Sequence, residues 1–450
     1  MRQRFITFAV FGIILVILGE WNLRTRKIAP IVSLDQLWLE FCIGNAGDKI
    51  ADPAISVVRI NDEYEPLNIG TEESDDDGNL SRLDFATILG FVGKMDPKSV
   101  AFLPIPTFDE THILNQTDIV PLKDAAMQLP RFSVATNVTE ETTDAAQAKP
   151  LTYQAIKVEG DPKDILSFSR TLRFPDPQLT SNADPVFKAI ESQRDLVDNE
   201  VIRIPLVARH GEKVVPSIVL SSIAKHNGIG NDEITLDLTT RQAKIRLGDS
   251  RIVPIEPDGT FIIPPHAGLS RNMTSLKRNE AGEMEKVHHF TTLTVDELAY
   301  TGEKDDEVAK RILASFQGKF KSLSENIVVI GFDRNNDRRY TTATGEVLSE
   351  TMLLARAMAT IQSGRFINQW PATGRWLAIL LIAAIAAFLF TLPKRKFIPF
   401  CFVAALIFFA LNVIIFRSTL SWAPPFSAFA LFGLIFLIGL LLSGNKKQQE

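Results

Sequence analysis

An acidic segment in the first fifth of the chain has the residue spacing of a calcium-binding loop. Glu73, Asp75 and Asp77 fall at loop positions 1, 3 and 5, and Asp84 falls at position 12. Carboxylate oxygens at this spacing suit a hard cation such as Ca²⁺. A typical loop, however, begins with Asp and ends with the longer Glu, whereas this chain has the reverse. We therefore expect a solvated acidic loop, with a cation site as the alternative.

Two further positions carry side chains that could bind a small ligand. Asp333 and Asp337 follow a run of β-branched residues, and open α/β sheets bind ligands at the carboxyl ends of their strands. Arg82 precedes an amphipathic stretch, where its guanidinium could hold an anion. Turn formation explains the two Asp residues equally well, and a structural salt bridge is the alternative for Arg82.

The sequence lacks the motifs of an enzyme. It has no Gly-Lys-Ser/Thr phosphate loop, no Gly-x-Ser-x-Gly elbow and no His-Glu-x-x-His pair. His288 and His289 are adjacent on an extended segment and would point to opposite faces, so we expect no transition-metal site there. A net charge of −5 gives no basic surface for nucleic acid. We expect no catalytic residue, no cofactor and no nucleic-acid partner.

Four apolar runs set the expected organisation. Three of them, Trp376–Leu392, Phe397–Phe416 and Trp422–Leu442, lie near the C-terminus and are long enough to cross roughly 30 Å of hydrocarbon as helices. The fourth, Phe5–Leu18, predicts a first membrane helix over residues 5–20. A cleaved signal peptide is the alternative for this run, although no small-x-small cleavage pattern follows it.

Basic residues indicate the orientation of these spans. They cluster before the first run, between the second and third runs and in the tail: Arg2, Arg4, Lys394, Arg395, Lys396, Lys446 and Lys447. The positive-inside rule makes all three places cytoplasmic, including residues 1–4 and 443–450. Arg24, Arg26 and Lys27 favour the opposite orientation but conflict with an even number of crossings. Residues 28–370 are therefore expected outside the cytoplasm.

This outer region is expected to be an α/β domain with a mixed sheet. A strand at Ile55–Ile60, a helix over Leu83–Val92 and a strand at Ser99–Leu103 have the short joins of a parallel β-α-β unit. Further strands are expected at Arg131–Val138, Val201–Ala208, Ile234–Leu238, Ala243–Leu247, Arg251–Ile255, Thr260–Ile263 and Ile327–Gly331. Further helices are expected at Leu34–Ile43, Leu122–Leu129, Pro216–Lys225, Asp306–Phe316 and Glu350–Gln362. Thr139–Asp184 has too little periodicity to assign.

Several segments together carry a family resemblance. They are Ile55–Glu63, Ser81-Arg82, Val201–Leu220, Ile245–Pro265, Ile327–Gly364 and the three C-terminal spans with Ser421-Trp-Ala-Pro-Pro before the last. In this order they resemble the second class of CHASE-type sensory domains. Such domains look outward from a bacterial inner membrane on receptor cyclases and kinases, with an output domain after the third span. The resemblance makes Asp62 a further ligand-binding candidate beside Arg82, Asp333 and Asp337.

The resemblance implies a multi-pass inner-membrane protein with an extracytoplasmic sensory domain. Because the sequence ends at Glu450, we expect the signal to pass to a separate protein partner in the membrane or envelope. The alternative is an envelope scaffold that binds another protein without sensing a small-molecule ligand. Asn412, the strongly polar residue at membrane depth, is expected to bond a neighbouring helix rather than carry ions.

Overall fold

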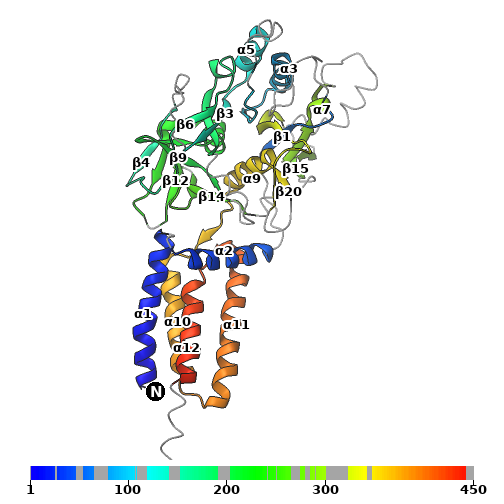
Figure 1. Ribbon diagram of the computed structural model, residues 1–450. Coiled ribbons are helices and arrows are strands. Elements are labelled where there is room, and N and C mark those ends of the chain that lie inside the picture. The colour runs from blue at the N-terminus through cyan, green and yellow to red at the C-terminus, as the bar shows by residue number, and fades with distance from the viewer. Residues whose placement is uncertain are drawn as a thin grey trace, which may run out of the picture. The chain divides into compact units, whose positions relative to one another are not determined.

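The computed structural model divides the chain into two compact units (Figure 1). The helical unit comprises Met1–Gly47 and Ile367–Glu450, and the α/β unit comprises Asp48–Phe366. The structure describes residues 2–25, 28–46, 54–64, 80–106, 108, 119–140, 153–190, 203–240, 242–249, 251–264, 274–278, 284–288, 290–299, 323–341 and 347–441. The expected helix Asp306–Phe316 lies outside these residues.

The α/β unit contains a mixed seven-stranded sheet. Its strands are β1 (Ile55–Ile60), β2 (Ser99–Phe102), β3 (Phe132–Thr139), β6 (Arg170–Arg173), β7 (Asp184–Ile190), β17 (Phe290–Thr294) and β18 (Ile327–Phe332). Strands β17, β1, β18, β2 and β3 lie in this order and are all parallel. Strand β3 also pairs with β7 in the parallel sense and with β6 in the antiparallel sense. The expected mixed α/β fold is confirmed.

The two strands of the expected β-α-β unit, β1 and β2, are parallel but not neighbours. Strand β18, from near the end of the α/β unit, lies between them and pairs with both. All but the last residue of β18 are buried, as expected for a central strand of a parallel sheet. The sequence therefore predicted the parallel sense of β1 and β2 but not the strand between them.

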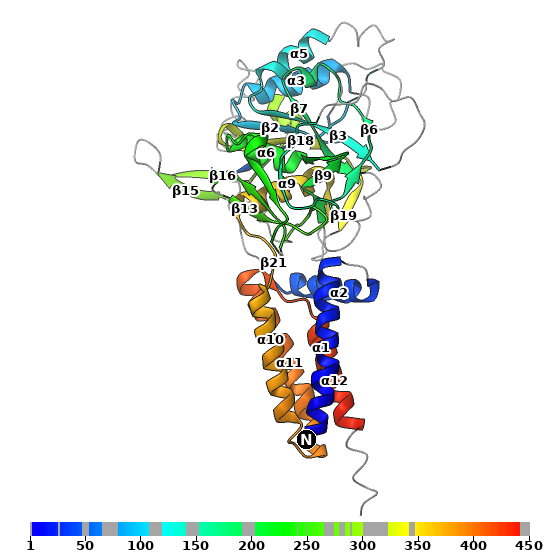
Figure 2. The ribbon, with the colours of Figure 1, turned by 90° about the vertical axis from the view of Figure 1, so that its left-hand side faces the viewer.

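Helices cover both faces of this sheet (Figure 2). They are α3 (Arg82–Gly93), α5 (Ile119–Gln128), α6 (Ile218–His226), α7 (Val295–Ala299) and α9 (Glu350–Ser363). Val58 and Ile330 pack with α3, α5 and α7, whereas Val57 and Val329 pack with α6 and α9. Because side chains alternate along a strand, adjacent residues serve opposite layers of the core.

Smaller sheets are formed mostly by segments that lie between β3 and β17 in the chain. Their strands are β4 (Lys157–Glu159), β5 (Ser167–Phe168), β8 (Arg203–Pro205), β9 (Val207–His210), β10 (Lys213–Pro216), β11 (Ile234–Asp237), β12 (Lys244–Leu247), β13 (Arg251–Pro254), β14 (Thr260–Ile262), β15 (Thr274–Arg278), β16 (Met284–His288), β19 (Arg339–Thr341) and β20 (Val347–Ser349). Strands β4, β5 and β6 come from Thr139–Asp184, which the sequence left unassigned.

The expected strand Val201–Ala208 is split between two sheets. Leu206, between β8 and β9, donates its N–H to Gly259 O at 3.0 Å and accepts from Ser217 N–H at 2.8 Å. A Cβ on Gly259, whose φ is +86°, would lie 2.9 Å from Val207 O. Only glycine allows this close approach, so β8 and β9 diverge beside the Asp258-Gly259 turn.

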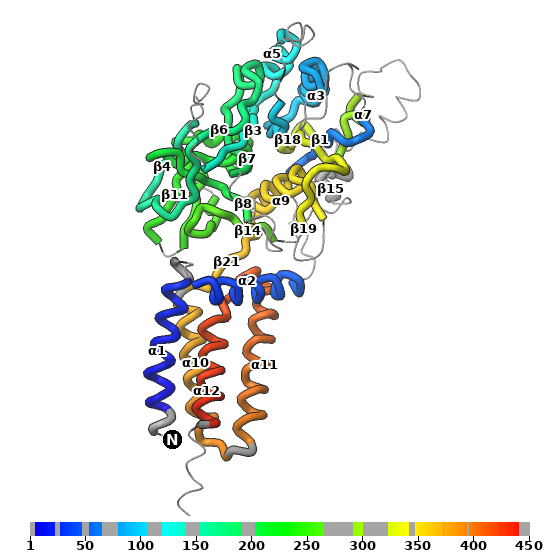
Figure 3. Tube along the Cα trace, viewed as in Figure 1, coloured from blue at the N-terminus to red at the C-terminus, as the bar shows by residue number. Residues whose placement is uncertain are grey.

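In the described part of the helical unit, long helices run side by side and a further helix crosses their end (Figures 1 and 3). The long helices are α1 (Arg2–Thr25), α10 (Ala372–Leu389), α11 (Lys394–Thr419) and α12 (Phe426–Leu441), and the crossing helix is α2 (Ala29–Gly44). Among the described residues, two segments are long and apolar enough to cross a membrane, Phe5–Asn22 and Lys396–Thr419. The apolar parts of α10 and α12, Thr373–Leu389 and Phe426–Leu440, are shorter.

The last expected span began too early. Trp422 belongs to a short strand, β22 (Ser421–Trp422), and α12 begins at Phe426. Pro424 and Pro425 intervene, and proline cannot donate the backbone hydrogen bonds that a helix interior requires.

Helix α2 packs within the helical unit rather than with the outer domain to which the sequence assigned it. The Trp38 ring lies 5.2 Å from Phe409 of α11 and 6.3 Å from Phe429 of α12, both edge-on. The buried Asp35 accepts from the Phe426 N–H at 3.4 Å. These contacts explain why residues 28–47 belong with the helices.

Candidate functional site

The carboxyl ends of β1 and β18 bring together three of the predicted site residues. Asp333 lies between two guanidinium groups, with Arg59 Nη1 at 3.0 Å and Arg339 Nη1 at 2.7 Å. Burial alone would raise the pKa of Asp333, but hydrogen bonds from Arg59, Arg339 and Ser349 hold it below its ordinary value. Asp333 is therefore a neutralised carboxylate that ties three segments together.

The other two carboxylates of this cluster are bonded to the backbone. Asp62 Oδ2 accepts from Asn335 N–H at 2.9 Å, and Asp337 Oδ2 accepts from Arg334 N–H at 2.6 Å. The first bond links the ends of the two strands, and the second closes a turn after β18. The cluster therefore fits the interpretation that these residues form turns, because their carboxylate oxygens already accept hydrogen bonds from the backbone of the same chain.

Arg82 forms a buried salt bridge at the start of α3. Its Nε and Nη2 donate to Asp176 Oδ2 at 3.0 and 2.7 Å, and the two side chains are 2% and 3% exposed. The guanidinium also lies over the Phe108 ring, 4.8 Å from its centroid. The structural salt bridge that the sequence offered as the alternative for Arg82 is therefore present, and Asp176 is its partner. The sequence did not identify Asp176, which lies in the unassigned stretch.

Asp84, the proposed last ligand of the calcium loop, caps α3 instead. Its Oδ2 accepts from both the N–H and the hydroxyl of Ser81 at 2.7 Å, and its Oδ1 accepts from the Tyr64 hydroxyl at 3.1 Å. This reciprocal capping box satisfies N-terminal donors of the helix. Glu73, Asp75 and Asp77 lie outside the described residues. Within the described part of the chain, no three His, Cys, Asp or Glu side chains are grouped to hold a metal.

The two adjacent histidines lie at the edge of the described residues. His288 ends β16 opposite Thr274, and His289 lies outside the described residues.

A different histidine, His226, is buried at the end of α6, with its Nδ1 3.1 Å from Ser99 Oγ. Burial lowers the pKa of His226 to about 4, and the positive charges of Lys98, Arg131 and Arg251 contribute. The imidazole is therefore neutral at physiological pH. The sequence offered no signal for it, because one histidine on an apolar helix face is not a motif.

We expect His226 to make the α/β unit sensitive to mild acid. Between the unfolded pKa of 6.5 and the folded pKa of about 4, only the unfolded chain gains the proton, so stability falls as the pH falls. The loss between pH 7 and pH 5 should be about 2 kcal/mol. His226→Gln should reduce this dependence, as measured by the difference in Tm between the two pH values. An unchanged difference would contradict the assignment.

In the helical unit, the segment before α10 pairs with the segment before α12. We call this pairing of Asn368–Trp370 with Leu420–Trp422 the clamp. Strand β21 (Asn368–Gln369) pairs in parallel with β22. Asn368 N–H donates to Leu420 O at 3.0 Å, and Trp370 N–H donates to Trp422 O at 2.9 Å. The indole of Trp370 adds a bond of 3.2 Å to Ser421 O. These hydrogen bonds therefore connect the N-terminal ends of α10 and α12.

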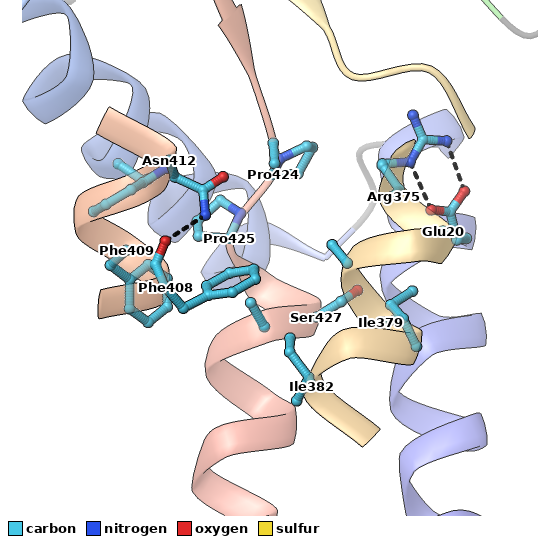
Figure 4. A pocket seen from close by; sticks show the side chains of 14 residues that line it. Glu20, Arg375, Ile379, Ile382, Phe408, Phe409, Asn412, Pro424, Pro425 and Ser427 are labelled. Carbon is cyan, nitrogen blue, oxygen red and sulfur yellow. Dashed lines mark hydrogen bonds and ion pairs between the residues drawn. The ribbon is translucent and has the colours of Figure 1, made fainter. Parts of the chain in front are cut away.

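An ion pair continues this clamp to the first helix (Figure 4). Arg375 of α10 donates from Nε and Nη2 to the two carboxylate oxygens of Glu20 in α1, at 2.8 and 2.9 Å. Its Nη1 donates to Trp370 O at 2.6 Å. The pair is bidentate and only partly exposed, which favours a fixed geometry. This pair was not among the predicted site residues, and its members are 355 positions apart.

No family model, curated protein or solved structure matches this chain.

Proposed function

We propose that this chain is a non-enzymatic inner-membrane protein whose α/β unit acts as an extracytoplasmic, CHASE-type sensory domain. It would pass a signal through its membrane helices to a separate protein partner. The observation that carries this proposal is the short covalent join between the two units. The Phe366 ring packs edge-on against Phe261 of the α/β unit at 6.0 Å, and Asn368 already belongs to the clamp of the helical unit.

A short join suits signal transmission because few residues can absorb a displacement. Only Ile367 lies between Phe366 and Asn368, and it is 7% exposed. A change in the α/β unit on ligand binding would thus be transferred to the start of α10 and, through β22, to α12. Transmission of this kind requires two states with different affinities for the stimulus.

The positions of the tryptophans support a membrane location for the helical unit. All five lie at one end of it, on α1, α2, the β21–α10 segment and β22: Trp21, Trp38, Trp370, Trp376 and Trp422. The basic turn 394–396 lies at the other end of α10 and α11. Trp is enriched at membrane–water interfaces, and Lys and Arg are enriched in cytoplasmic loops.

The short helices α10 and α12 are compatible with four crossings. They have 18 and 16 residues, or about 27 and 24 Å at 1.5 Å per residue, against roughly 30 Å of hydrocarbon. Irregular backbone is tolerated at membrane depth where protein satisfies its polar groups. The carbonyls of Leu420, Ser421 and Trp422 accept from the β21–Trp370 segment, so the stretch before α12 meets this condition.

The proposed topology predicts opposite behaviour of two reporter fusions. Alkaline phosphatase inserted at Gly248, in the turn between β12 and β13, should be active because it is exported. The same enzyme after Lys447 should be inactive because it remains in the cytoplasm. Immunoblots of both fusions control for expression, and the reverse pattern of activity would contradict the sensor proposal.

An envelope scaffold is the second candidate function. It is favoured by the strand-end cluster, where Asp62, Asp333 and Asp337 are all bonded to the chain's own groups. A scaffold would bind another envelope protein and need no ligand. Lengthening the join at Ile367 discriminates the two functions, because only the sensor requires the join to be short.

A further inference from the structure

A small cavity lies inside the helical unit (Figure 4). It has a volume of about 40 Å³, which is room for roughly three water-sized groups. Helices α10, α11 and α12 form its walls, Trp38 of α2 contributes to its lining, and Pro424 and Pro425 lie along one side. Glu20 and Arg375 lie at its edge, and the remaining walls are mainly apolar.

Asn412 places an unused hydrogen-bond acceptor in this cavity. The residue is 6% exposed, and its Nδ2 donates to Phe408 O, four positions earlier in α11, at 2.9 Å. Its Oδ1 is buried and has no hydrogen-bond partner among the described residues. The expectation that Asn412 bonds a neighbouring helix is therefore wrong. The oxygen points instead toward the Pro424–Pro425 segment (Figure 4).

A buried carbonyl without a donor is unfavourable, and the lining offers few donors. Both prolines lack an N–H, so the nearest backbone cannot satisfy the amide. Each guanidinium nitrogen of Arg375 already donates a hydrogen bond to Glu20 or to Trp370 O. Both Arg375 and the Ser427 side chain lie away from Asn412 across the cavity (Figure 4). A ligand that supplies one N–H or O–H with a short apolar arm would match this site.

We propose that the cavity binds the donor-bearing head group of a membrane amphiphile, with its ammonium or hydroxyl group bonded to Asn412 Oδ1. The three heavy atoms of an ethanolamine arm match the volume. The Glu20–Arg375 pair carries no net charge, which favours a zwitterionic head over an anionic one. The tryptophans Trp38, Trp376 and Trp422 mark the level at which lipid head groups lie. The inference rests on the proposed membrane location but not on signalling.

The test varies the number of N–H donors on the lipid and keeps its chains constant. The full chain is reconstituted into bilayers of phosphatidylcholine with an added share of phosphatidylethanolamine or its mono- or dimethyl derivative. Because choline alone has no N–H, phosphatidylethanolamine should raise the Tm of the helical unit by roughly 3 °C over pure phosphatidylcholine, and the rise should shrink with each added methyl group because the arm then exceeds the three heavy atoms that the cavity holds. Equal Tm values across the series would overturn the proposal.

Variants separate this site from general bilayer effects. Asn412→Leu should remove the dependence on donor lipids, and Ala378→Phe should do the same by filling the cavity. Ser418→Ala, an exposed position on the same helix, should keep it. A dependence that survives Asn412→Leu would contradict the site. Free ethanolamine added to pure phosphatidylcholine bilayers tests the source: stabilisation there would support the site but assign it to a soluble amine.

Discussion

Replacing Arg82 by methionine is expected to lower the free energy of unfolding of the α/β unit by about 3–5 kcal/mol. The change removes the cation that neutralises Asp176 while the carboxylate stays almost fully buried. An uncompensated buried charge is far more unfavourable than a lost contact, because water no longer solvates it. The expected fall in Tm is roughly 10 °C.

A solvent-exposed pair provides the matched control. Arg246 forms a salt bridge with Glu159 on the small sheet, but its side chain is 38% exposed and that of Glu159 is 51% exposed. Arg246→Met should therefore change stability by less than about 1 kcal/mol. Similar losses from Arg82→Met and Arg246→Met would show that burial does not determine the effect.

A double substitution tests whether the isolated charge is the cause. Adding Asp176→Asn to Arg82→Met removes the carboxylate charge but keeps an acceptor for Gln178 N–H, which lies 2.8 Å from Asp176 Oδ1. The double variant should recover much of the loss. The residue distribution makes the measurement selective, because all four tyrosines lie in the α/β unit and all five tryptophans lie in the helical unit. Near-ultraviolet circular dichroism of the full chain can therefore follow the two units separately.

The elements of the main sheet were predictable because each is a short β-branched run between breaking residues. Ile55–Ile60 and the run beginning at Ile327 were predicted within a residue of their observed ends. Their neighbours were not predictable, because burial on both faces is compatible with any central position in a parallel sheet. The split at Leu206 was missed for a related reason: periodicity identifies extended backbone but not the sheet that it joins.

The site residues show the same division between local and long-range information. Asp333 and Asp337 were found because polar residues after a strand lie at the edge of a sheet. Arg59 was missed because it lies inside β1, where it resembles any half-exposed strand position. Glu20 and Arg375 did offer a signal. They have opposite charges at the ends of apolar runs that face the same side of the membrane in the proposed topology.

If the protein is a sensor, a flexible insertion after Phe366 is expected to abolish its signalling without unfolding either unit. Phe366 is the last residue of the α/β unit, where it packs against Phe261, and only Ile367 separates it from β21. About ten Gly and Ser residues at this point would behave as a random coil with an end-to-end distance of roughly 17 Å. A displacement of α9 would then be absorbed by the linker before it reached the clamp. The Asn368–Leu420 hydrogen bond itself should be unaffected.

The same insertion after Gly211 provides the control, because this glycine lies in the exposed turn between β9 and β10. Each variant is expressed in a strain from which the gene for this protein has been deleted. The phenotype of the complemented strain is compared with that of the wild type. Near-ultraviolet circular dichroism verifies that both variants fold. If the protein is a sensor, the insertion after Phe366 should behave like the deletion, whereas the insertion after Gly211 should behave like the wild type. A scaffold works through its outer surface and does not need a short join. Full complementation by the Phe366 insertion variant would therefore reject signal transmission and favour the scaffold.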